Sequence, residues 1–389
     1  MISIAGKILA ELKIGDGDKS LVLQLGNLRY CHIIDDVGVL LPMFELSFLD
    51  VAGKSKDKVT IGDGTPFSAT LGKAESAGNL REMKFNTFTV KEHKETPSGY
   101  EYKIMGLLTA PKFLKGQFTK SFKGDSSTVI GNIAKECNLQ YKSLTSAPQD
   151  SQAWLSAGKA YGNFSHFVRE HGWVNDKSCM HSAVALDYPS DTLIYVNLTE
   201  QVKTQPVATF CIIEPKSSTG PTFRILNYEV VNKGGMSNNL SGYGHQKIVE
   251  HMDGTAVVHN PVAATKMESS LNIDKSIKQD IPLVKREYSP IDCGNTNDKF
   301  TKAYHQNARL RATYSNYLTL VTNEFTGVKL YDVVQVTLPD QVQGGSSDGN
   351  SGKYMVNGKI RIITGSNYYE RLKLISTGSN VDSGSDYVT

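Results

Sequence analysis

The residues able to do chemistry are scattered along this 389-residue chain rather than gathered into a motif. His245 and His251 stand six residues apart, a spacing that suits neither one helical face nor an obvious turn for a metal pair. His166 and His171 fall on one expected helix, and a core position is favoured over catalysis for His171. His181 begins the run HSAV, which lacks the setting of a nucleophile elbow. The histidines therefore predict no catalytic or metal site.

Carboxylate pairs that hydrolyse sugars are not predicted either. Glu170, Asp176 and Asp187 lie near one another in the sequence, but nothing there fixes their separation or raises one pKa. The turns Gly15–Asp18 and Gly62–Gly64 have the composition of calcium loops, yet neither supplies the ligand series and distal glutamate of an EF-hand. Hairpin turns are the favoured interpretation, with a stray bound ion as the alternative. No catalytic, metal-binding or cofactor-binding residue is therefore assigned, and no cofactor is expected.

Aromatic residues offer a third kind of site. Trp154, Trp173, Phe164 and Phe167 could form a platform that stacks on sugars or bases. The helical spacing of the two phenylalanines favours the core of a small domain instead. Without a reactive cluster, the chain is expected to be an assembly component and not an enzyme.

The composition is that of a globular protein, with 39% apolar and 21% charged residues. A net charge of +3 gives no electrostatic argument for nucleic-acid binding. No apolar run approaches the ~18 residues of a membrane-spanning helix. Lys7, Glu11 and Lys13 interrupt the first apolar stretch, which argues against a secretion signal. The five cysteines are scattered without CxxC spacing, as is typical of a protein made in a reducing cytosol.

The elements that position these residues are mostly strands. The first 110 residues alternate apolar and polar positions between turns rich in Gly, which predicts an antiparallel sandwich or barrel. The character changes at Pro111, where helices are expected. Asp125 or Ser126 can cap a helix that stops at Asn138, and a second helix ends at Gly172.

Strand patterns resume after residue 205. A helix is predicted at Asp298–Arg311, and residues 233–295, rich in Gly, Ser and Asn, are assigned no regular structure. The further predicted strands are Ala208–Ile213, Phe223–Val231, Tyr317–Thr322 and Val328–Leu338.

A hairpin closes the regular part of the chain, with its turn at Thr364–Asn367. Its first arm alternates, which places Tyr354, Val356, Ile360 and Ile362 on one face. The other face is expected to be a basic outer surface. That surface could meet DNA phosphates in a channel, but solvent or a partner protein explains it better. The basic residues are Lys353, Lys359, Arg361, Arg371 and Lys373.

Together these patterns predict a mainly β fold with an α+β insert. Two tube-like antiparallel β-barrel or sandwich domains flank a small α/β domain, and an internal duplication is one explanation of this order. The expected segments are a first tube-like β-domain at 1–111, a small α/β insert domain at 112–205, a second tube-like β-domain at 206–376 with a helix near 298–311, and a flexible tail at 377–389.

Six landmarks in this order resemble one family, the central hub proteins of phage tail baseplates, also called late control protein D-like. The hub half of type VI secretion spike proteins is similar. The hairpin has Thr364 where the family usually has a histidine. The landmarks are SSTVIGNIAKECNL at Ser126–Leu139, the tryptophan segment Gln152–Trp154, FSHFVREHGW at Phe164–Trp173, the helix Asp298–Arg311, the strand Gly327–Leu338 and the hairpin Ser351–Leu374.

The resemblance implies a homotrimer in which each subunit contributes two tube-like domains to a pseudo-sixfold ring. Such a ring adapts a sixfold tail tube protein to a threefold central spike protein and encloses the channel, where DNA is present only in transit. It also contacts the tape-measure protein and other baseplate proteins. The implied location is the virion, in the tail baseplate, after assembly in the host cytoplasm. Two alternatives remain: a tail-associated peptidoglycan hydrolase, and a tail-tip protein that binds a receptor or glycan.

Overall fold

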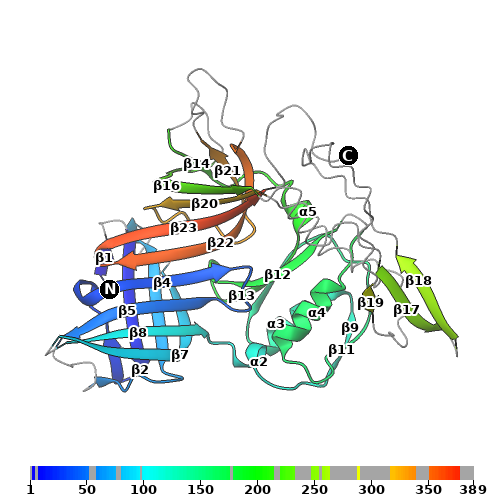
Figure 1. Cartoon of the computed structure of the whole chain (residues 1–389), viewed down its shortest axis with the longest axis horizontal. Helices are drawn as coiled ribbons and strands as arrows, with labels where there is room; N and C mark the ends of the chain where they lie inside the picture. The colour runs from blue at the N-terminus through cyan, green and yellow to red at the C-terminus, as the bar shows by residue number, and fades with distance from the viewer. Residues whose placement is uncertain are drawn as a thin grey trace.

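Strands dominate the chain, and most of them belong to one 15-stranded sheet (Figure 1). The expected mainly β fold with a helical insert is confirmed. The structure is a computed structural model, and it describes residues 2–4, 8–51, 58–75, 80–96, 99–175, 178–213, 220–232, 247–253, 256–262, 287–289, 316–338 and 350–376. The helix expected at 298–311 and the tail at 377–389 lie outside these residues.

The first β-region is built from alternating strands whose inward residues form the core. In β2, for example, Ile8, Ala10, Leu12 and Ile14 are all buried. Its elements are β1 (Ile2–Ile4), β2 (Ile8–Asp16), β3 (Lys19–Val22), the 3-10 helix η1 (Leu25–Asn27), β4 (Leu28–Asp36), β5 (Met43–Val51), β6 (Pro66–Lys73), β7 (Arg81–Thr96) and β8 (Gly99–Leu108).

The insert carries the two predicted helices. The Asp125 carboxylate accepts a hydrogen bond from Thr128 N at 2.9 Å and caps α3, which ends before Asn138 at a φ of 57°. Helix α4 begins at Tyr161 and ends at Glu170, just before the predicted stop at Gly172. The elements are α2 (Pro111–Leu114), β9 (Ser121–Gly124), α3 (Ser126–Glu136), β10 (Gln140–Leu144), β11 (Gln152–Leu155), α4 (Tyr161–Glu170), β12 (Met180–Ala185), β13 (Thr192–Asn197) and α5 (Leu198–Gln201).

The second β-region differs from prediction in four places. The stretch 328–338 is not one strand, because a turn at 329–332 precedes β21. The stretch 223–231 divides into two strands, and residues 233–295 contain strands β17 to β19. Strand β14 pairs in parallel with both β15 and β21, not antiparallel. The elements are β14 (Thr209–Cys211), β15 (Thr222–Arg224), β16 (Asn227–Asn232), β17 (Lys247–Asp253), β18 (Ala256–Val262), β19 (Glu287–Ser289), β20 (Asn316–Thr322), β21 (Val333–Thr337), β22 (Gly352–Thr364) and β23 (Asn367–Ser376).

The two β-regions share one strand order. The first runs β4-β5-β8-β7-β6-β2 across the sheet, and the second runs β16-β20-β23-β22-β21-β14. These are corresponding strands, because each set takes the same sequence order along the chain. The four pairings among the first five strands are antiparallel in both regions. Only the sixth strand differs, being antiparallel in β2 and parallel in β14.

Local details of the backbone repeat as well. Gly64, just before β6, has a φ of 77° and donates from N to Thr87 O at 2.7 Å. Tyr331, just before β21, has a φ of 67° and donates from N to Val356 O at 2.8 Å. The two residues therefore occupy the same left-handed position in corresponding turns, which supports an internal duplication.

The long hairpins repeat their irregularity. In β7–β8 the register shifts between Thr87 and Thr89, and in β22–β23 it shifts between Val356 and Gly358. In β22–β23 the strands then run to a two-residue turn at Gly365 and Ser366, whereas β7–β8 has a further register shift between Lys94 and Thr96. Because a bulge inserts one unpaired residue at a defined place, its recurrence identifies Phe88 and Asn357 as equivalent residues.

Candidate assembly interface

Among the described strands, one pairing joins the two β-regions edge to edge, and it is here called the seam. Strand β4 of the first region pairs antiparallel with β22 of the second, from Cys31 opposite Ile363 to Asp36 opposite Gly358. The second region therefore continues the sheet of the first, and the insert lies to one side of this junction (Figure 1).

The bulge at Asn357 overturns the prediction of a basic outer face for Lys359 and Arg361, whereas Lys353 and Arg371 are exposed as predicted. Before the bulge, Tyr354 and Val356 are buried as predicted, but beyond it the buried positions shift by one residue. Lys359 is 0% exposed and Arg361 is 2% exposed. An extra residue in one strand moves every later side chain to the opposite face. The signal that could have revealed this is Gly358, since glycine inside a strand often marks a bulge.

The buried cations meet two buried carboxylates. Lys359 Nζ lies 3.2 Å from Asp187 Oδ1 and 3.4 Å from Glu370 Oε2, and it donates to Val328 O at 3.0 Å. Arg361 also donates to Asp187 Oδ1. The cluster thus ties the β12–β13 loop of the insert to β22 and β23.

Hydrogen bonds satisfy the second carboxylate in this cluster. Glu370 Oε2 accepts from the Thr326 hydroxyl at 2.5 Å, and Glu370 Oε1 accepts from the Tyr368 hydroxyl at 2.7 Å. A buried charge is tolerated only when it is paired and hydrogen-bonded. The arrangement therefore specifies one packing of the second hairpin against the insert.

The first β-region contributes a third carboxyl group. Asp35 of β4 is 0% exposed, and its Oδ2 accepts from Leu186 N at 2.8 Å. Burial, followed by the charge of Asp187, raises the pKa of Asp35 to about 7. Burial also acts to raise the pKa of Asp187, but Arg361 and Lys359 outweigh it and lower that pKa. The two cations thus hold the pKa of Asp187 low, while Asp35 titrates near neutrality.

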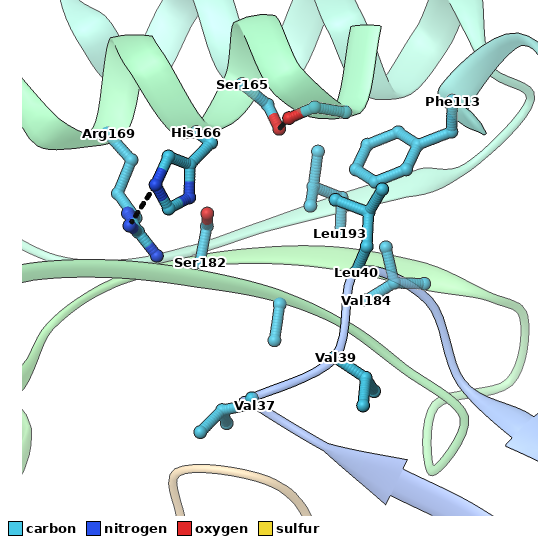
Figure 2. A pocket seen from close by; sticks show the side chains of 13 residues that line it. Val37, Val39, Leu40, Phe113, Ser165, His166, Arg169, Ser182, Val184 and Leu193 are labelled. Atoms are coloured by element: carbon cyan, nitrogen blue, oxygen red, sulfur yellow. Dashed lines mark hydrogen bonds between the residues drawn. The ribbon is translucent and has the colours of Figure 1, made fainter. Parts of the chain in front are cut away.

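A cavity of about 250 Å³ lies between the turn after β4 and the insert. Figure 2 shows the turn residues Val37, Val39 and Leu40 on one side of the cavity, and Arg169 and His166 of helix α4 on the other. No carboxylate lines this cavity. It therefore lacks the paired acids that sugar hydrolysis requires.

The two described candidates for hydrolysis, Glu170 and Asp187, do not form a site. His166 Nε2 contacts Glu170 Oε1 at 2.9 Å, and this hydrogen bond lowers the pKa of Glu170. Glu170 therefore stays ionised and is unsuited to act as a general acid. Asp187 belongs to the buried cluster, and Asp176 lies outside the described residues.

The remaining histidines are structural where their side chains are described. His171 is buried and its Nδ1 lies 2.8 Å from Phe167 O, which confirms the predicted core position. His181 Nδ1 forms a 2.7 Å hydrogen bond with the Tyr331 hydroxyl, and burial, then Arg169, lowers the pKa of His181 to about 3. The structure does not describe the side chains of His245 and His251.

The aromatic residues and acidic turns also take structural places. Trp154 is 2% exposed and donates from Nε1 to Gly124 O at 2.9 Å, and Phe164 is fully buried, so both belong to the core of the insert. The residues 15–18 form the β2–β3 turn, as predicted. No group of three or more metal-ligating side chains occurs in the described part of the chain, and no helix there is long and apolar enough to cross a membrane.

Comparison with known proteins identifies structures that share this architecture. No family model and no curated protein matches the sequence. The 43 kDa tail protein of prophage MuSo2 from Shewanella oneidensis aligns over 95% of this chain and 98% of its own, at 11% identity and a TM-score of 0.59. The tail protein from Neisseria meningitidis MC58 aligns over 94% of this chain and 96% of its own, at 12% identity and a TM-score of 0.55.

These likenesses show a shared fold. Both aligned structures are tail proteins, one of them from a prophage, and their fold agrees with the resemblance inferred from the sequence.

Proposed function

We propose that this protein is the structural hub of a phage tail baseplate. Three copies form a pseudo-sixfold ring around the central channel, and each copy contributes its two β-regions as neighbouring sectors. The ring adapts a sixfold tail tube to a threefold spike. It acts through shape and contact, and no catalytic step is required of it.

The observation that carries this proposal is the duplicated β-region. Corresponding strands, bulges and turns in the two halves let three chains present six similar surfaces. A symmetric ring also provides a partner for every exposed strand edge. The seam between β4 and β22 supports the proposal further, because it already joins two equivalent units side by side.

The proposed partners follow from this geometry. The tube protein meets one rim of the ring, the central spike protein meets the other, and the tape-measure protein enters the channel with other baseplate proteins nearby. DNA passes through without a binding site. The two most buried basic residues of the last hairpin are neutralised by carboxylates and offer no phosphate contact there.

Solution mass tests the proposal. Light scattering on the purified full chain is expected to give a species of about 128 kDa, three times the 42.6 kDa of the chain. A monomer at every concentration, including in the presence of the cognate spike, contradicts the hub.

A further inference from the structure

We propose that the subunits join by repeating the seam between chains: the edge of β7 beyond its bulge pairs antiparallel with β16 of a second copy. This inference rests on the proposed ring and assigns the edges that close it. The argument comes from the duplication itself, because β7 corresponds to β22 and β16 corresponds to β4.

Both edges are open among the described strands. Strand β6 covers β7 only as far as Asn86, and past the bulge β7 pairs with β8 alone. In the second hairpin the corresponding edge, from Gly358 onward, is occupied by β4. Strand β16 pairs only with β20. The first β-region thus lacks, past its bulge, the neighbour that the second has.

The open edges of β7 and β16 cannot pair with each other within one chain. Six strands separate β7 from β16 in the sheet, namely β8, β5, β4, β22, β23 and β20. At about 4.8 Å per strand spacing, the edges are far apart along the sheet. The partner is therefore a second copy of this chain.

The register follows from the equivalences. In the seam Ile34 lies opposite Ile360. Counting from the shared bulge, Ile360 corresponds to Lys91, because Gly358 corresponds to Thr89. Ile34 corresponds to Val231, since each occupies the same place on its strand relative to the adjoining hairpin. The predicted pairing therefore sets Lys91 of one chain opposite Val231 of the next.

The exposure of Val231 and the charged residues on the β7 edge agree with this register. Val231 is 45% exposed, whereas its counterpart Ile34 is half-buried in the seam. Lys91 and Glu92 are exposed on the open β7 edge, and charged residues are a common device against unregulated edge pairing.

Cysteine cross-linking tests the register in the full chain. The variant Lys91→Cys/Val231→Cys is made in a Cys293→Ser background, in which the four remaining native cysteines are all buried. Paired Cα atoms in an antiparallel ladder are about 4.5–5.5 Å apart, within disulfide range. Mild oxidation is expected to give covalent dimers and trimers on a non-reducing gel.

The matched control is Glu92→Cys/Val231→Cys, whose cysteines fall on opposite faces of the same pairing. It is expected to give at least tenfold less cross-linked product. Light scattering is run on both variants before oxidation. A trimer with equal or absent cross-linking in the two variants overturns the proposed edges and leaves the ring intact. A monomer throughout overturns both the edges and the ring.

Discussion

The two long hairpins share a backbone and differ in what they bury. Residues Val90, Glu92 and Tyr102 of the first hairpin correspond to Lys359, Arg361 and Glu370 of the second. Glu92 is exposed, whereas Arg361 is 2% exposed against Asp187. The repeated strands therefore set the path of the chain, but the neighbouring elements decide which side chains can be charged and buried.

The difference shows which hairpin edge is covered within the chain and which is left uncovered. The second hairpin is covered by β4 and by the insert, which supply Asp35 and Asp187. In the described part of the chain, β5 covers the β8 edge of the first hairpin, but no strand lies beside β7 past its bulge. We interpret the ionic cluster as an intrachain contact that fixes the second hairpin, and the open β7 edge as the place where the next chain binds.

The largest effect on stability is expected from disrupting the buried ionic cluster. Lys359→Met leaves two buried carboxylates facing one cation, and removing one partner of a buried ion pair costs about 3–5 kcal/mol. Urea unfolding followed by circular dichroism measures the loss. The control is Lys353→Met on the same strand, which is exposed and should change stability by less than about 0.5 kcal/mol. Equal losses in the two variants would show that the cluster does not hold the hairpin.

Much of the insert, and the turn of the last hairpin, could be predicted from the sequence because their signals are local. Asp125 as cap, Asn138 as stop and the two-residue turn of the last hairpin each depend on residues a few positions apart. The burial of Lys359 and Arg361 could not be predicted in this way. It depends on a bulge and on Asp187, which lies 172 residues from Lys359 in the chain.

The sequence only suggested the duplication, because the two halves share a backbone path but not a pattern of residue types. The same turn uses Gly64 in one half and Tyr331 in the other, and only the first is a recognisable turn signal. Tyr331 is held in its unusual conformation by burial and by its hydrogen bond to His181. The single strand predicted across 328–338 does not form, because Tyr331 interrupts the extended backbone.

A second, smaller effect concerns pH and Asp35. Its pKa of about 7 in the folded chain lies above the ~3.9 of an unfolded aspartate. Between these values the folded state holds a proton that the unfolded state has lost, so the free energy of unfolding falls as pH rises through this window. The groups facing Asp35 are Asp187, Arg361 and Lys359.

The variant Asp35→Asn removes this titration while keeping an oxygen for Leu186 N. From pH 5 to pH 8 the wild type is expected to lose about 2 kcal/mol more than the variant. Urea titrations at the two pH values measure this difference. Parallel pH profiles would mean that Asp35 is ionised across the whole range.

The smallest effect tests the repeated turn. Gly64→Ala places a side chain at a φ of 77°, which costs about 1 kcal/mol although the space around it is open. Gly62→Ala, in the same turn and equally unobstructed but outside the left-handed region, should cost less than about 0.5 kcal/mol. Thermal unfolding of the two variants compares them. A Gly64→Ala variant as stable as wild type would remove the turn from the argument for duplication.

The end-on view of the assembled hub tests the central claim most directly. Averaged electron micrographs of the purified oligomer are expected to show three chains arranged as six similar lobes around a channel. A closed particle with three lobes, or with any number of lobes other than two for each chain, would show that the matching halves do not occupy equivalent places.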